Sequence, residues 1–282
     1  MSTFSQRLTQ LVARDHERVS DKGRTIVRLH GGRRPRAVIL LHGMTASPAQ
    51  FERFARDLYE RGHNVLVPRL PRHGHADRFS TALARLRPDD LYKAGANYVE
   101  VGRELGERVT IAGFSLGGLL AAWIAQHHDV DRAVAIAPFL GVAWIPGFFM
   151  SAISELSLRI PNRFPWWDPV LREKQQPEHG YPRYSTHAVA HAFRLAGRLL
   201  RDASRNAPRA RRTVLIANAG ESTVDNRAIA RLYAKWRSLA PQSVELLMLE
   251  GLPRSHDVVE PLNYTELANR AYPFLLRAID PQ

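Results

Sequence analysis

The chain has 282 residues, 45% of them hydrophobic, which is enough for one large domain with a buried core. Because it contains no cysteine, disulfides, thiolate metal sites and a cysteine nucleophile are excluded. The formal net charge is +13, but the arginines are spread along the chain and do not gather with aromatic residues, so we expect no specific nucleic-acid partner.

Strand-like and helix-like segments alternate along most of the chain. Short apolar runs typical of buried strands lie at residues 24–30, 37–41, 64–68, 109–114, 131–137, 213–219 and 243–249. Helix patterns lie between them at residues 48–61, 89–105, 119–125 and 226–233. We expect a turn at residues 31–35 to join the first two strands as a hairpin. The alternation predicts an α/β fold in which helices cover both faces of a mostly parallel central sheet.

The strand at residues 109–114 ends in a Gly-x-Ser-x-Gly motif, and a helix of small apolar residues follows at once. This order is typical of a nucleophile elbow, in which a sharp, strained turn exposes the serine between a strand and a helix. Gly113 and Gly117 flank the serine because side chains there would collide with a neighbouring strand or helix. The amides that begin the helix favour nearby negative charge. We therefore predict Ser115 as a nucleophile.

A serine hydroxyl needs a general base and an orienting acid, which in this motif class follow the serine along the chain. His256 lies in a loop directly after the strand at residues 243–249, where its imidazole can reach Ser115. We therefore predict His256 as the base. Several other histidines look like surface or helix-end residues, namely His63, His127, His128 and His179.

The orienting acid has two candidates after the strand at residues 213–219. Glu221 is nearer to the carboxyl end of that strand, where catalytic groups collect in open α/β sheets. Asp225 lies four residues later, directly before the helix at residues 226–233, and it suits a helix N-cap. We favour Glu221 as the acid, with Asp225 as the alternative.

An oxyanion hole requires backbone N–H donors beside the serine. The predicted donors are the amides of Leu116, next to Ser115, and of Met44, in the loop after the strand at residues 37–41. His42 and Gly43, in the same loop, are expected to contact the substrate. A second histidine–glycine pair, at His30, precedes a strand instead of following one, so we assign it to the turn.

Five segments carry a family resemblance: Leu41-His42-Gly43, Pro71-Arg72-His73-Gly74-His75, Gly113-Phe114-Ser115-Leu116-Gly117-Gly118, the stretch from Glu221 to Val224-Asp225, and Ser255-His256-Asp257. Together they resemble the α/β-hydrolase superfamily, and within it the bacterial carboxylesterases and monoacylglycerol lipases. The resemblance runs from about Ala37 to the end of the chain and implies the α/β-hydrolase fold with a Ser–His–acid triad. Such relatives usually carry Asp where this chain has Glu221, and many have a second acid at the position of Asp225.

The segment at residues 139–212 departs from the strand–helix alternation. It is rich in proline and aromatic residues and lies between two core strands, where an insertion would overhang Ser115. We interpret it as a helical cap inserted into a core made of residues 1–138 and 213–282. Trp166 and Trp167 are predicted to line an apolar substrate pocket under this cap, and the cap is also a candidate for weak contact with a membrane surface.

These residues predict a serine hydrolase that cleaves carboxylic esters through an acyl-enzyme, with no cofactor and no metal. The resemblance favours small-molecule acyl esters, either medium-chain esters or monoacylglycerols. The alternatives are hydrolysis of an amide, thioester or C–C bond on the same scaffold, or a catalytically silent binding module. The first residues lack an apolar signal segment and no apolar run reaches the length of a membrane span, so we expect a cytoplasmic enzyme.

Overall fold

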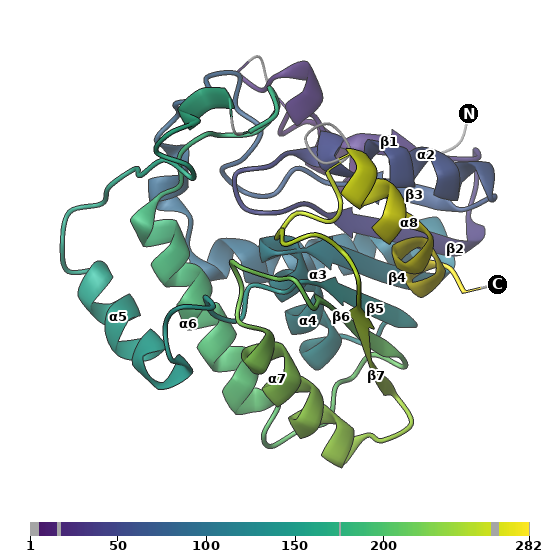
Figure 1. Ribbon diagram of the computed structural model, residues 1–282. Coiled ribbons are helices and arrows are strands. Elements are labelled where there is room, and N and C mark those ends of the chain that lie inside the picture. The colour runs from purple at the N-terminus through teal and green to yellow at the C-terminus, as the bar shows by residue number, and fades with distance from the viewer. Residues whose placement is uncertain (1–5, 16–17, 175, 261–264, 282) are drawn as a thin grey trace.

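The computed structural model describes residues 6–15, 18–174, 176–260 and 265–281. Its centre is a seven-stranded sheet with the order β1-β3-β2-β4-β5-β6-β7 (Figure 1). The strands are β1 (Ile26–Arg28), β2 (Arg34–Leu41), β3 (Asn64–Val67), β4 (Gly106–Phe114), β5 (Arg132–Ile136), β6 (Thr213–Asn218) and β7 (Val244–Leu249). Every neighbouring pair is parallel except β1 with β3. The predicted α/β fold with a mostly parallel sheet is confirmed.

The predicted hairpin between the first two strands is wrong. β3 lies between β1 and β2, and β1 pairs with it antiparallel, with Val27 opposite Leu66. The chain crosses the beginning of β3 on its way to β2, and the Asn64 side chain holds this crossing. Its Oδ1 accepts from the amide of His30 at 2.9 Å, and its Nδ2 donates to the carbonyl of Gly32 at 2.7 Å. His30 therefore lies beside the first residue of β3, at the edge of the sheet opposite to the one where β4 ends.

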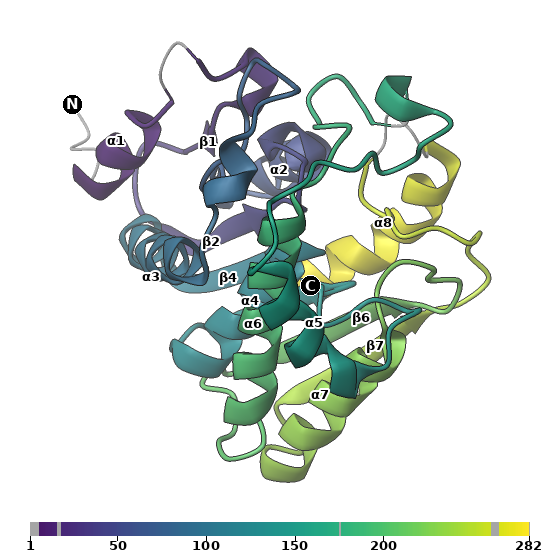
Figure 2. The same ribbon diagram turned by 90° about the vertical axis from the view of Figure 1, so that its left-hand side faces the viewer.

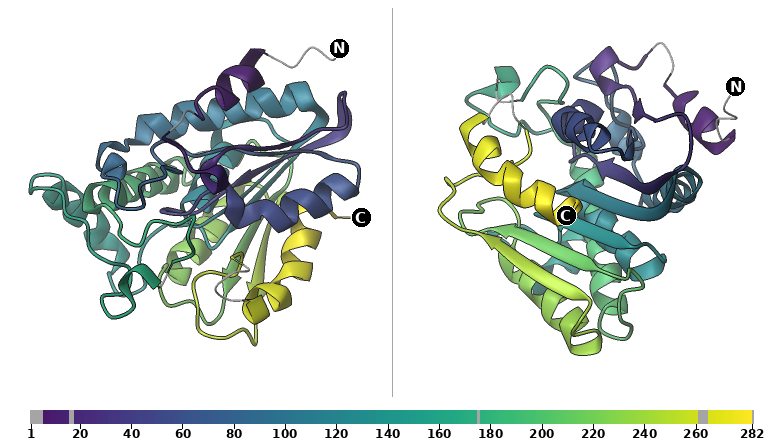
Figure 3. Two further views of the ribbon diagram at one scale, coloured as in Figure 1. Left: turned by 90° about the horizontal axis from the view of Figure 1, so that it is seen from above. Right: turned by 90° about the vertical axis from the view of Figure 1, so that its right-hand side faces the viewer.

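Helices cover both faces of the sheet, as Figure 3 shows. One face carries α2 (Glu52–Glu60) and α8 (Thr265–Ile279), and the other carries α3 (Pro88–Leu105), α4 (Leu116–His127) and α7 (Asn226–Leu239). The short α1 (Gln6–Val12) packs on α3. None of the helices in the described parts of the chain combines the length and the apolar character that a bilayer crossing needs.

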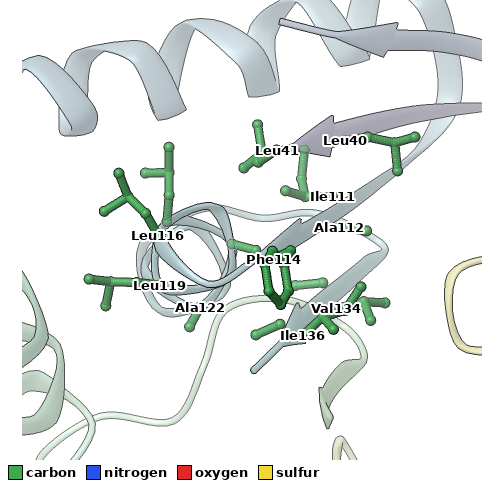
Figure 4. Close-up of a cluster of buried hydrophobic side chains, with 14 of the residues drawn as sticks. Leu40, Leu41, Ile111, Ala112, Phe114, Leu116, Leu119, Ala122, Val134 and Ile136 are labelled. Carbon is green, nitrogen blue, oxygen red and sulfur yellow. The ribbon is translucent and has the colours of Figure 1, made fainter. Parts of the chain in front are cut away.

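A layer of buried apolar side chains from β2, β4, β5 and α4 surrounds the junction of β4 with α4 (Figure 4). Its labelled members are Leu40, Leu41, Ile111, Ala112, Phe114, Leu116, Leu119, Ala122, Val134 and Ile136. Close packing leaves such side chains little freedom to shift, so the turn between β4 and α4 sits on a rigid base.

Residues 139–212 leave the sheet after β5 and return to it at β6. They contain α5 (Met150–Ser157) and α6 (Thr186–Asp202), which lie side by side (Figures 1 and 2). α6 also packs on α4. The final residues run along the core, where the amides of Arg209 and Ala210 donate to the carbonyl of Ala125. The division of the chain into a core and a cap stays a prediction.

Candidate active site

Ser115 occupies the sharp turn between β4 and α4 with a φ of 54°, in the left-handed region that non-glycine residues rarely adopt. The turn requires both flanking glycines. A Cβ on Gly113 would lie 2.1 Å from the carbonyl oxygen of Gly117, and a Cβ on Gly117 would lie 2.0 Å from that of Leu41. This confirms the predicted reason for the two glycines. The strained turn leaves the Ser115 side chain at the edge of the sheet.

The loop after β7 brings His256 against Ser115. Nε2 of His256 lies 2.9 Å from Oγ of Ser115, and Nδ1 lies 2.8 Å from Oε2 of Glu221. Because an ionised carboxylate only accepts hydrogen bonds, Nδ1 carries the proton and Nε2 is left to accept from the serine hydroxyl. The three side chains form one continuous hydrogen-bonded chain.

Glu221 is held at both carboxylate oxygens. Oε2 contacts His256, while Oε1 accepts from the amides of Ser222 at 2.8 Å, Thr223 at 2.7 Å and Val224 at 3.3 Å. Burial alone would raise the pKa of Glu221, whose side chain is 1% exposed. The hydrogen bond and charge of His256 and the loop amides outweigh burial, so the pKa of Glu221 lies below its ordinary value. The carboxylate is therefore ionised at neutral pH.

Asp225, the alternative acid, has other partners. Its Oδ1 accepts from the amide of Arg227 at 2.9 Å and caps α7, and its Oδ2 pairs with Arg231 at 3.1 Å. The structure thus brings Glu221, and not Asp225, into contact with His256.

The loop after β2 faces the same site. Gly43 and Met44 line a cavity of about 320 Å³ together with Ser115 and His256. Leu116 begins α4, so its amide has no acceptor within the helix. The positions of Met44 and Leu116 suit the predicted oxyanion hole, and their role stays a prediction.

His42 is not among the residues that line this cavity, although we predicted that it contacts substrate. Its ring is fully buried, Nδ1 donates to the carbonyl of Gly43 at 2.9 Å, and Nε2 accepts from the amide of Leu70 at 3.1 Å. Both ring nitrogens are therefore engaged in joining two backbone segments. His42 positions the loop that holds Met44.

We expect the protein to lose stability as the pH falls below 6.5, because two neighbouring histidines are buried as neutral rings. Burial lowers the pKa of His73 to about 4, and burial and His73 lower the pKa of His42. Both rings stay neutral in the folded chain, whereas they take up protons near pH 6.5 when it unfolds. The contribution of the two rings to the free energy of unfolding is complete above pH 6.5. Below pH 6.5 it falls by about 1.4 kcal/mol per pH unit for each ring.

Urea unfolding at pH 7 and pH 5 tests this, with His73→Asn as the comparison. Asn retains a donor toward the carbonyl of Pro71, which accepts from His73 at 2.9 Å, but it does not titrate. Between pH 7 and pH 5, we expect the free energy of unfolding of the variant to fall by about 2 kcal/mol less than that of the wild type. Equal losses in both proteins would remove His73 from the explanation.

The two tryptophans that we predicted in the substrate pocket lie in different places. Trp167 lines the Ser115 cavity, and its Nε1 donates to Oγ1 of Thr45 at 2.8 Å. Trp166 does not line it, because its ring packs against Phe79, and the Arg183 guanidinium lies over it. The structure therefore does not place Trp166 at this cavity.

Two buried polar contacts near the site were not predicted. Gln50 joins the loop after β2 to the loop of His256, since its Oε1 accepts from the amide of Gly43 at 2.9 Å and its Nε2 donates to Asp257 at 3.1 Å. His179, which we placed on the surface, is buried beside Glu260 with 3.0 Å between Nε2 and Oε2. No local pattern marks these contacts because each joins segments far apart in the chain.

The parts of the chain that the structure describes contain no group of three His, Asp or Glu side chains arranged to hold a metal ion. The residues that the structure brings together at the site are thus Ser115, His256 and Glu221, with Gly43, Met44 and Trp167 around the cavity.

Comparison with known proteins gives the family. The model of the alpha/beta hydrolase family matches residues 38–264, so the chain belongs to the α/β-hydrolase family. A thermostable monoacylglycerol lipase from Bacillus sp. (strain H-257) is 25% identical over 133 residues, which cover 43% of this chain and 52% of the lipase. The chain thus matches about half the length of this curated relative.

Solved structures show the same fold. A structure described with LipS and LipT, two metagenome-derived lipolytic enzymes, has a TM-score of 0.67 and 21% identity and covers 91% of this chain and 98% of its own. The monoacylglycerol lipase of Paleococcus ferrophilus has a TM-score of 0.66 and 19% identity. The match covers 90% of this chain and 98% of the lipase chain. The fold is therefore one that lipases and esterases also use.

Proposed function

We propose that the protein is a serine esterase in which Ser115, His256 and Glu221 form the catalytic triad. The observation that carries this proposal is the hydrogen-bonded chain from Ser115 Oγ through the His256 ring to the Glu221 carboxylate. It joins a nucleophile, a base and an orienting acid in the order that acyl transfer requires.

In the first half of the reaction, Ser115 Oγ attacks the ester carbonyl carbon while His256 Nε2 takes the hydroxyl proton. Glu221 stabilises the imidazolium that forms. The carbon–oxygen bond to the alcohol then breaks, and Nε2 returns the proton to the departing alcohol. In the second half, His256 takes a proton from water, the water oxygen attacks the acyl-enzyme, and the acid is released as Ser115 regains its hydroxyl.

The negative charge of each tetrahedral intermediate needs fixed donors. We assign this role to the amides of Met44, in the loop after β2 that lines the cavity, and of Leu116, the first residue of α4 after Ser115. Loss of one such donor typically costs about 3–4 kcal/mol of transition-state stabilisation. The Gln50 bridge supports this geometry because it ties the amide of Gly43 to the loop of His256.

The proposed substrates are medium-chain acyl esters or monoacylglycerols. Two observations support this choice: the aromatic side chains of Phe139 and Trp167 line the cavity, and the similar Bacillus protein is a monoacylglycerol lipase. We propose that residues 139–212 act as the cap over this cavity. Weak contact of the cap with a membrane surface stays a prediction, supported by exposed apolar side chains such as Trp144 and Val170.

Hydrolysis of p-nitrophenyl esters from acetyl to palmitoyl, with Ser115→Ala as the comparison, tests the proposed function. We expect Ser115-dependent release of p-nitrophenol with a maximum at intermediate chain length. Absence of hydrolysis across the series in a folded protein would contradict an esterase. It would favour another scissile bond or a silent binding module.

Trimming the two tryptophans should separate substrate contact from packing. Trp167→Phe opens the Ser115 cavity and is expected to raise kcat/KM for lauroyl relative to butyryl esters about tenfold, because one methylene in an apolar pocket is worth roughly 1–3 kcal/mol. Trp166→Phe, the matched control outside the cavity, should leave this ratio unchanged. An equal change in both variants would rule out a pocket role for Trp167.

A further inference from the structure

A second cavity, of about 610 Å³, lies beyond the Ser115 site between α5, α6 and the start of α7. Its size falls in the range of roughly 300–1,000 Å³ that is usual for ligand pockets. Apolar side chains form part of its wall, namely Leu140, Met150, Phe193 and Leu200. In Figure 2, α5 lies in front of α6, with α7 below them. The cavity is larger than the one at Ser115.

Four arginines and the carboxylates of Glu155 and Asp225 also line this cavity, and two of the arginines have no ion-pair partner in the described chain. Arg194 is paired with Glu155 at 2.6 Å, and Arg231 is paired with Asp225. Arg198 donates to the hydroxyl of Tyr92 at 3.2 Å, and the Arg201 guanidinium makes no hydrogen bond or ion pair within the described chain. Both side chains are exposed at the mouth of the cavity. Within the described chain, Arg198 and Arg201 thus present two guanidinium groups without an ion-pair partner on one face of α6.

A glycine inside α6 forms part of the cavity wall. Gly197 lies one turn before Arg201, and the neighbour that a Cβ there would meet is Nη1 of Arg201 at 3.6 Å, an ordinary contact distance. Glycine weakens a helix interior relative to alanine, and no close approach of the backbone requires it here. What Gly197 provides is empty volume beside the arginines.

Two stacked phenylalanines separate the second cavity from the Ser115 site. Phe139 lines the Ser115 cavity and Phe193 lines the arginine cavity, and their rings lie 5.2 Å apart with an angle of 9° between them. The amide of Phe139 donates to the carbonyl of Ser115 at 3.0 Å, so the ring pair is attached directly to the backbone of the predicted nucleophile. The ring pair therefore lies between the two cavities.

We infer that the arginine cavity binds a medium-chain fatty acid, with its carboxylate at Arg198 and Arg201 and its alkyl chain along Phe193 and Met150. The choice of a carboxylate rests on the proposed function, because ester hydrolysis at Ser115 produces this anion. Guanidinium groups bind carboxylates through strong charge-assisted hydrogen bonds, and the apolar wall accommodates the chain. The site would receive the acid product and clear the Ser115 cavity for the next ester.

Calorimetric titration of Ser115→Ala protein with decanoate tests the site without any turnover. We expect saturable binding of decanoate that is at least tenfold tighter than binding of the uncharged methyl decanoate. Adding Arg198→Gln and Arg201→Gln should weaken decanoate binding at least tenfold. Arg205→Gln, an exposed arginine outside the cavity, is the matched control and should bind decanoate as the parent does.

Gly197→Leu provides an independent test, because leucine fills the cavity and strengthens the helix. It should raise the midpoint of thermal unfolding and abolish decanoate binding, whereas Gly197→Ala should raise the midpoint and retain binding. Binding that is unchanged in Gly197→Leu or in the double arginine variant, or equal for decanoate and methyl decanoate, would overturn the inference. If decanoate binds as expected while no ester is hydrolysed, the proposed function fails and the fatty-acid site stands.

Discussion

Replacement of Ser115 by alanine is expected to lower kcat for ester hydrolysis by roughly 10⁴- to 10⁶-fold while the free energy of unfolding changes little. The hydroxyl is the atom that attacks the ester, and the partner of that hydroxyl in the described structure is His256. The side chain lies in the turn between β4 and α4 beside a cavity, so its removal creates no void in the core.

His256→Ala should cause a loss of similar size, and combining the two substitutions should lower kcat no further, because residues that act as one unit are not additive. Ser238→Ala, which removes an exposed serine hydroxyl on α7, is the matched control and should retain full activity. Turnover of a p-nitrophenyl ester and urea unfolding measured on each variant check both claims. A Ser115→Ala or His256→Ala protein with more than a tenth of wild-type kcat would contradict the triad.

The second large effect is expected at Glu221. Glu221→Gln should lower kcat by about 10⁴-fold, because an amide in place of the carboxylate favours the wrong tautomer of His256 and no longer stabilises the imidazolium. Glutamine keeps the size of the side chain and one oxygen for the loop amides that Glu221 accepts from. The effect should therefore appear in kcat more than in stability.

Asp225→Asn is the comparison for this prediction and should change kcat by no more than about threefold. Asparagine still caps α7. The lost partner is Arg231, and because its own side chain is 48% exposed this ion pair contributes little. Both variants are assayed on the same ester at saturating concentration. A large loss in Asp225→Asn with near-normal Glu221→Gln would reassign the acid to Asp225.

The parts of the fold that depend on local pattern could be predicted from the sequence. The glycines around Ser115, the apolar strands and the capping position of Asp225 all follow from residues close together in the chain. The pairing of β1 could not be predicted in this way, because Gly31 and Gly32 suit a turn between any two strands. The position of β3 between β1 and β2 depends on contacts distant in sequence.

The same distinction applies to the site. The positions of Ser115, His256 and Glu221 follow from a motif, from chain order and from the ends of two strands. The direction of a side chain on a loop depends on packing, so neither the place of Trp167 at the cavity nor the packing of Trp166 on Phe79 could be predicted. Burial of His179 beside Glu260 was missed because polar loop residues usually lie on the surface.

The central claim is that Ser115 is an activated nucleophile. Incubation with a fluorophosphonate, followed by intact-mass and peptide mass spectrometry, tests it most directly because the reagent needs no knowledge of the natural ester. We predict one adduct per chain, located on Ser115, that is absent from Ser115→Ala and forms at least a hundred times more slowly in His256→Ala. No adduct in the folded wild-type protein, or an adduct on another residue, would contradict the account.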